Sequence, residues 1–195
     1  AVMRSPPVAR RSPAEGGTDH AARERFIEGW LTASLLFCVG PLTILAHGVW
    51  LDDVELELIA ERGSTVVANP AANMKLAVGG VLPYQASARA GVGIGLGTDG
   101  VSSNSNLDMF EEVRLASFVA KASSNDPTVV PAATALLMAT RMGAQALHIG
   151  DITGSLEPGK RADLILVHTA PVHNSPRFRR NPNNAYAQLV FAAKS

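Results

Sequence analysis

Residues 92–110 read VGIGLGTDGVSSNSNLDMF, an apolar run punctuated by glycine and followed by a single carboxylate. The run 92–97 is typical of a buried parallel strand. Asp99 comes next, then a polar turn rich in serine and asparagine, and a helix is expected to begin near Leu107. Barrels of parallel strands carry their functional residues at this end of each strand. The stretch therefore predicts an α/β fold with an acid at the mouth of the sheet, suited to metal ligation or proton transfer.

The rest of the chain alternates strand and helix patterns. Two further apolar runs, residues 42–46 and 64–68, predict buried strands that end next to His47 and Asn69. A late strand is expected at residues 163–168. Helices are expected at residues 21–37, 52–60, 83–90, 107–122 and 131–147, the second of them opened by a capping box of Asp52 and Glu55, and a loop is expected to carry Asn73 and Lys75.

Three β/α units of this kind build a parallel sheet whose two faces are both covered. They do not close a barrel, because an eight-stranded barrel needs about 250 residues. The chain is therefore either a small open α/β sheet or a part of something larger.

The composition is that of a globular protein without a strong charge. Of 195 residues, 47% are hydrophobic and 17% charged, and 17 Lys and Arg balance 17 Asp and Glu. Neither nucleic acid nor an anionic membrane is expected as a partner. Cys38 is the only cysteine, which excludes an internal disulfide and a CxxC zinc site and fits a reducing, cytoplasmic compartment. We expect Cys38 to be a small buried hydrophobe rather than a nucleophile.

Residues 29–51 contain no Asp, Glu, Lys or Arg, and their length could span a bilayer. Gly40 and Pro41 interrupt the middle of the stretch, and polar residues such as His47 dilute it. A helix, a break and then a buried strand explain the pattern better than a membrane span.

Four motifs in order resemble the amidohydrolase superfamily: LAHGVWLDD (45–53), NPAANMKL (69–76), the stretch from GTDG to Glu111 (97–111) and GSLEPGKRADL (154–164). The branch that they resemble most is the family of 5-methylthioadenosine/S-adenosylhomocysteine deaminases and triazine chlorohydrolases. The resemblance covers residues 20–192.

This resemblance implies the C-terminal part of a (β/α)8 TIM barrel, about strands six to eight with their helices, and a remnant of a small β domain. Residues 1–19 are then a disordered or unrelated segment, and residues 20–150 a partial barrel. Residues 151–195 return towards the small domain and end in a helix.

In that family the barrel holds a divalent metal, usually zinc or iron. Its ligands are an HxH pair, a histidine of the fifth strand and an aspartate after the eighth, and a sixth-strand histidine lies beside the metal-bound water. By motif, Asp99 matches the aspartate, as metal ligand and proton carrier, and His47 matches the sixth-strand histidine. Glu15, Asn73 and Ser103 are expected to contact the substrate.

The chain departs from the family pattern where the other ligands belong. It contains no HxH pair, and the best counterpart of the fifth-strand His-x-x-Glu motif is Ser12 to Glu15, with serine in the ligand position. Ala68 and Ala72 also replace a usual histidine and serine. Because zinc sites use at least three protein ligands, the chain alone is expected to be inactive.

The function implied is that of a metal-dependent hydrolase of non-peptide C–N bonds. Its small-molecule substrate would be an aminopurine nucleoside or related ring, such as methylthioadenosine or S-adenosylhomocysteine, or a triazine. The alternative is a non-catalytic α/β module that associates through its open barrel edge, for instance as a homo-oligomer.

Gly95, Gly97 and Gly100 match the dinucleotide fingerprint GxGxxG literally. Asp99 would direct a negative charge at the pyrophosphate, and the acids that follow come too soon for the ribose contact. Nucleotide binding of this kind is therefore disfavoured.

Overall fold

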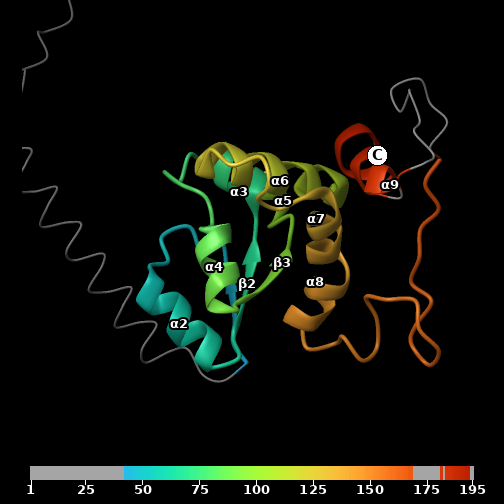
Figure 1. The fold of residues 1–195 in the computed structure, drawn as a ribbon, viewed down its shortest axis with the longest axis horizontal. Helices are drawn as coiled ribbons and strands as arrows, with labels where there is room; N and C mark the ends of the chain where they lie inside the picture. The colour runs from blue at the N-terminus through green and yellow to red at the C-terminus, as the bar shows by residue number, and fades with distance from the viewer. Residues whose placement is uncertain (1–41, 169–180, 182, 194–195) are drawn as a thin grey trace, which may run out of the picture. The chain divides into compact units, whose positions relative to one another are not determined.

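Three short parallel strands form the centre of the computed structural model, which describes residues 42–168, 181 and 183–193 (Figure 1). The strands are β1 (Ile44–Ala46), β2 (Thr65–Ala68) and β3 (Gly93–Leu96), in the spatial order β1-β2-β3. Leu45 is in register with Val66, which is in register with Ile94. The three strands predicted from the sequence are confirmed, and so is the α/β class of the fold.

Helices join the strands and run against them. Between β1 and β2 lies α2 (Asp53–Glu61), and between β2 and β3 lie α3 (Pro70–Lys75) and α4 (Tyr84–Ala90). The predicted capping box of α2 is present: Asp52 Oδ1 accepts the Glu55 N–H at 2.8 Å, and Glu55 Oε2 accepts the Asp52 N–H at 3.1 Å. These two bonds satisfy amides that a helix start otherwise leaves unpaired.

The loop predicted around Asn73 and Lys75 is wrong, because these residues lie in α3. Pro70 occupies the first turn of this helix, where a missing N–H costs nothing and a fixed φ favours the helix. Asn73 is therefore placed by a helix and not by an irregular segment.

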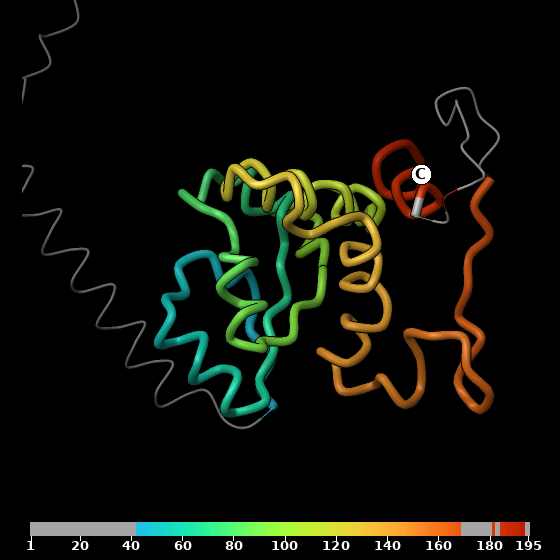
Figure 2. The backbone as a smooth tube through the Cα atoms, viewed as in Figure 1, coloured from blue at the N-terminus to red at the C-terminus, as the bar shows by residue number. Residues whose placement is uncertain are grey.

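After β3 come α5 (Val101–Asn104), α6 (Met109–Ser124), α7 (Ala132–Ala139) and α8 (Arg141–Ala146). The tube in Figure 2 shows the chain passing from α6, which lies across the upper end of the strands, into α7 and α8, which run beside them. The predicted single helix 131–147 is wrong: Thr140 leaves helical geometry, with φ −125° and ψ −97°, and divides the segment. A Cβ at Gly143 would lie 2.9 Å from the carbonyl oxygen of Met138, so the tight junction needs glycine there.

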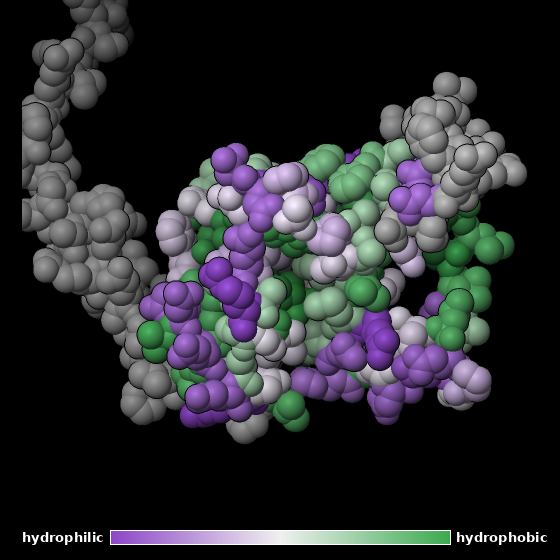
Figure 3. Space-filling model, viewed as in Figure 1, coloured by the Kyte–Doolittle hydropathy of each residue, from purple (hydrophilic) through white to green (hydrophobic). Residues whose placement is uncertain are grey.

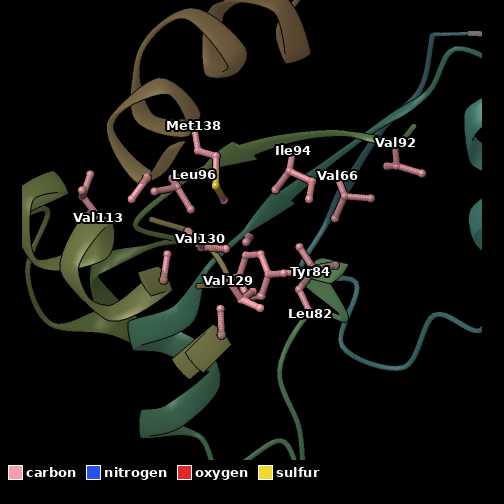
Figure 4. Packing of buried hydrophobic residues seen from close by; sticks show 14 of the residues in the cluster. Val66, Leu82, Tyr84, Val92, Ile94, Leu96, Val113, Val129, Val130 and Met138 are labelled. Carbon is pink, nitrogen blue, oxygen red and sulfur yellow. The ribbon is translucent and has the colours of Figure 1, made fainter. Parts of the chain in front are cut away.

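The two faces of the sheet differ in the size of their side chains. Val66 and Ile94 point into a cluster with Leu82, Tyr84 and Met138 (Figure 4). Glycines of β3 occupy the opposite face, where α8 packs, and a Cβ at Gly95 would lie 3.3 Å from the Cα of the glycine in α8. The close approach of α8 to the sheet therefore depends on the glycines of β3, which have no side chains in the way. The largest fully buried apolar side chains are Leu56, Ile59, Leu82, Met138, Val66 and Val190.

The late strand predicted at residues 163–168 is wrong, because that segment has no regular secondary structure. Leu164, Ile165 and Leu166 are 56%, 72% and 94% exposed, and apolar side chains stand at the surface there in Figure 3. A strand forms only where another strand takes up its N–H and C=O groups, and no partner strand lies beside these residues within the described part of the chain.

The last described segment packs on α6 and α7. It consists of α9 (Asn183–Ala187) and the π-helix η2 (Gln188–Ala192). The Arg114 guanidinium donates to the carbonyl oxygens of Val190, at 3.1 Å, and of Ala193. The rings of Phe118 and Phe191 stack with centroids 5.4 Å apart.

Within residues 42–168 and 183–193, every helix is too short or too polar to cross a bilayer. Most of the stretch 29–51, the helix predicted at 21–37 and Cys38 lie outside the described residues.

Candidate active site at the carboxyl ends of the strands

The carboxyl ends of the three strands meet at one edge of the sheet and are fastened there by Asn69. Its Oδ1 accepts the His47 N–H at 3.4 Å, just after β1, and its Nδ2 donates to the Gly97 carbonyl at 3.0 Å, just after β3. Asn69 is buried, so solvent does not compete for these bonds. A Cβ on Gly97 would come within 2.9 Å of Val67 Cγ1 and 3.1 Å of Asn69 Nδ2, so this contact needs glycine.

His47 is held from one side and faces Asp99 on the other. Its Nδ1 lies 2.8 Å from Asn73 Oδ1, an oxygen that can only accept, so Nδ1 carries the proton and donates it. Its Nε2 then points to Asp99 Oδ2 at 3.8 Å. The two side chains are 40% and 30% exposed, so a small molecule can reach the gap between them.

Asp99 is fixed as an anion at the end of β3. The Gly100 N–H donates to its Oδ1 at 2.7 Å. This bond, followed by a hydrogen bond from Ser103 and by the nearby imidazole of His47, lowers the pKa of the Asp99 carboxyl below its usual range. The group is therefore ionised at neutral pH and can receive a proton.

Both functional side chains sit on left-handed backbone, with φ +66° at His47 and +61° at Asp99. Histidine and aspartate tolerate this region better than most residues, yet it is sparsely populated. Strained backbone of this kind concentrates at functional sites.

The structure brings together four of the five residues that the sequence singled out. His47 and Asp99 lie at the strand ends, Ser103 in α5 hydrogen-bonds Asp99, and Asn73 is buried beside His47. Glu15 lies outside the described residues. A hollow of about 290 Å³ between α4 and the end of α6 is lined by none of these four.

Sequence reasoning missed Asn69, Asn104 and Glu112 as parts of this site. Glu112 stands among other charged residues at the start of its helix, where acids are usually exposed, but the structure buries this side chain completely. A signal was available, because Glu112 falls on the same face of its helix as Ala116 and Ala120, which are also buried.

The donors present do not make a complete zinc site. Within the part of the chain that the structure describes, no three histidine, cysteine, aspartate or glutamate side chains converge. His47 and Asp99 are donors of the right chemistry, but zinc sites in proteins use three or four. These residues therefore fit as a portion of such a site and not as the whole.

The chain belongs to the amidohydrolase family, whose sequence pattern matches residues 14–195. It is 50% identical over 154 residues to a 5'-deoxyadenosine deaminase of Methanoregula boonei, a match that covers 79% of this chain and 33% of the relative. It is 43% identical over 155 residues to a 5-methylthioadenosine/S-adenosylhomocysteine deaminase of Thermococcus kodakarensis, covering 80% of this chain and 35% of the relative.

Solved structures of the same family agree. A zinc-bound adenosine deaminase from Xanthomonas campestris superposes with a TM-score of 0.71 at 45% identity, covering 77% of this chain and 33% of that one. The zinc complex of the atrazine chlorohydrolase TrzN from Arthrobacter aurescens TC1 gives a TM-score of 0.70 at 25% identity, covering 78% and 32%. The chain thus spans about a third of the length of the relatives that it matches.

Proposed function

We propose that this chain supplies strands six to eight of a (β/α)8 barrel to a metal-dependent aminohydrolase. The observation that carries the proposal is the 3.8 Å approach of His47 Nε2 to Asp99 Oδ2 at the carboxyl ends of parallel strands. Barrel enzymes build their active sites at that end. The 3-stranded parallel sheet and the zinc-bound relatives support the same assignment.

In this proposal Asp99 is a metal ligand and the proton carrier of a hydrolytic deamination. A zinc or iron ion, when bound, lowers the pKa of a water molecule towards neutrality. Water adds to the ring carbon that bears the amino group, and the ionised Asp99 carboxylate receives a proton from the water. Asp99 returns this proton to the departing amino nitrogen, so that ammonia leaves, and the second proton of the water passes to the ring nitrogen as the ring carbonyl forms.

His47 acts on the oxygen that the water contributes, which gains negative charge as it gives up its second proton. Its Nδ1–H is committed to Asn73, so when the imidazole takes up a second proton, that proton is on Nε2 and faces the reaction space and Asp99. An imidazolium in this position donates a hydrogen bond to the oxyanion. The main role of Asn73 in this proposal is to orient the His47 imidazole.

The substrate class proposed is an adenosine-type nucleoside altered at its 5' position. The support is the identity of 50% and 43% to relatives named for 5'-deoxyadenosine and 5-methylthioadenosine/S-adenosylhomocysteine. Ser103, which hydrogen-bonds Asp99, and Glu15 remain proposals for substrate contacts, as does any contact of Asn73. A cytoplasmic location also stays a prediction.

We expect the isolated chain to be inactive, because its sequence has no HxH pair. The test uses the chain and a chimera in which residues 42–195 replace the matching part of the Methanoregula boonei deaminase. The chain alone should hold no stoichiometric zinc or iron and release no ammonia from 5'-deoxyadenosine. The chimera should hold one metal ion and release ammonia.

Asp99→Asn in the chimera should abolish ammonia release and weaken metal retention, whereas the exposed Asp151→Asn should do neither. A chimera that folds, holds metal and keeps full activity with Asp99→Asn contradicts the assignment of Asp99.

A second candidate function rests on the edge of β1. Within the described residues β1 pairs on one side only, and Ile44, its first residue, and Leu42, just before it, are 41% and 59% exposed. Such an edge can pair with another chain. A metal-free chain that forms a discrete oligomer in solution, broken by Ile44→Lys, favours this non-catalytic role.

A further inference from the structure

Glu112 is a fully buried carboxylate that touches both halves of the candidate site. It lies in the first turn of α6 with 0% of its side chain exposed. Its Oε2 accepts the Ala71 N–H at 3.2 Å, and its Oε1 accepts from Asn104 Nδ2 at 2.7 Å. A carboxylate is the only side chain of this shape that offers an acceptor to each of these two donors.

The first of these bonds leads to His47. Ala71 lies in the first turn of α3, where backbone N–H groups lack partners within the helix. Two residues further along the same short helix, Asn73 Oδ1 accepts from His47 Nδ1 at 2.8 Å. The bond between Ala71 and Glu112 holds the start of α3 to α6, and this fixes the position of Asn73 relative to the His47 imidazole.

The second bond leads to Asp99. Asn104 Nδ2 has two hydrogens, and it donates to the Thr98 carbonyl at 2.7 Å as well as to Glu112. Thr98 directly precedes Asp99, whose left-handed φ of +61° needs support from its surroundings. The Asn104 amide thus ties the backbone at Asp99 to the same buried carboxylate.

We infer that Glu112 is the positioning residue that sets His47 and Asp99 at their working separation by holding α3 and the Thr98–Asp99 backbone to α6. It touches neither side chain and acts through Ala71 and Asn104. That the His47–Asp99 separation matters for catalysis rests on the proposed function. The hydrogen bonds of Glu112 that set this separation do not depend on metal or substrate.

The amide variant Glu112→Gln tests the need for two acceptors. The new side chain keeps the shape but has one acceptor and one donor end, so its NH2 meets either the Ala71 N–H or the Asn104 NH2. Asn104 could reverse its own amide to accept from the new NH2, but it would then lose its bond to the Thr98 carbonyl. In every orientation at least one of the two connections breaks.

The experiment is NMR spectroscopy of the 195-residue chain without metal or substrate. Hydrogen exchange of the Ala71 amide reports the α3 connection, the Gly100 amide shift reports its bond to Asp99 Oδ1, and the ring ¹⁵N shifts of His47 report its bond to Asn73. If Glu112→Gln breaks the bond to Ala71, hydrogen exchange of the Ala71 amide should become about tenfold faster and the His47 signals should move. If it breaks the bond to Asn104 instead, the Gly100 amide signal should move upfield.

Two further variants complete the test. Glu111→Gln changes the neighbouring carboxylate, which accepts from Asn106 at the surface, and should leave all three signals in place. Asn104→Ala leaves Glu112 in place but removes its connection to Thr98, so the Gly100 signal should move while Ala71 keeps its protection. This variant also decides the matter if Glu112→Gln does not fold.

A purely stabilising role for Glu112 predicts a different result. Glu112→Gln would then lower the melting temperature and leave the Gly100 and His47 signals at their wild-type positions, which overturns the inference. Unmoved signals in Asn104→Ala overturn it equally. Neither result bears on whether Asp99 binds metal, which the chimera tests separately.

Discussion

The Nδ1 atom of His47 and the Oδ1 atom of Asn73 lie 2.8 Å apart, although they come from the end of β1 and from α3. Asn73 is 4% exposed, so water does not compete for this bond. The bond fixes the tautomer of the neutral imidazole, with the proton on Nδ1 and a lone pair on Nε2 directed to Asp99.

Asn73→Ala should remove the preference of the neutral His47 imidazole for a proton on Nδ1. In the wild-type chain at high pH, the ¹⁵N signals of His47 should show a protonated Nδ1 and a bare Nε2, and the variant should show the proton shared between the two nitrogens. The lost hydrogen bond should also cost about 1 kcal/mol of stability. Asn106→Ala, at an exposed amide, is the control. A wild-type His47 with its proton on Nε2 contradicts the prediction.

Asp52→Ala should destabilise the chain by about 1 kcal/mol, because it removes the oxygen that accepts the Glu55 N–H at 2.8 Å. Urea unfolding followed by circular dichroism measures the change. Glu57→Ala on the exposed side of the same helix should stay within about 0.5 kcal/mol of wild type. Equal effects of the two substitutions would mean that the capping box contributes nothing.

The strands and the cap of α2 were predictable because their signals are local. A run such as 64–68 is apolar whatever surrounds it, and a capping box joins residues only three positions apart. The resemblance to the family placed His47 and Asp99 at the ends of two strands with one strand between them, and the structure has them after β1 and β3, on either side of β2.

The predictions that failed concern residues whose local structure is set by contacts with residues far away in the sequence. Thr140 breaks a helix because α7 and α8 must turn against the sheet, and nothing in its neighbours along the sequence demands that. Residues 163–168 have a strand composition, yet a strand needs a partner that local sequence does not supply. The burial of Glu112 was not predicted, because its partners, Ala71 and Asn104, are brought to it only by the fold.

Ile59→Ala should destabilise the chain by about 2–5 kcal/mol, since Ile59 is 0% exposed and its loss leaves a cavity in the hydrophobic core. Val54→Ala removes two methyl groups from the same helix at a side chain that is 73% exposed, and it should cost no more than about 0.5 kcal/mol. Chemical unfolding of both variants gives the comparison. A cost below about 1 kcal/mol for Ile59→Ala would place this side chain outside the core.

The buried carboxyl of Glu112 makes the stability of the chain depend on pH. Burial raises the pKa of the Glu112 carboxyl above its ordinary value of 4.5, although hydrogen bonds from Ala71 and Asn104 act in the opposite direction. Between these two pKa values the folded chain holds a proton that the unfolded chain releases. The stability that this proton contributes is therefore complete below pH 4.5 and is lost as the pH rises through the raised pKa.

Glu112→Gln removes this titration, so the stability of the wild type relative to the variant should fall as the pH rises from below 4.5 towards neutrality. The comparison isolates Glu112, because Glu55, whose pKa is also raised by burial, is present in both proteins and cancels. Urea unfolding of the two proteins across this range measures the difference. A difference that grows with pH would mean that the hydrogen bonds to the carboxylate outweigh its burial, and that the folded chain favours the anion.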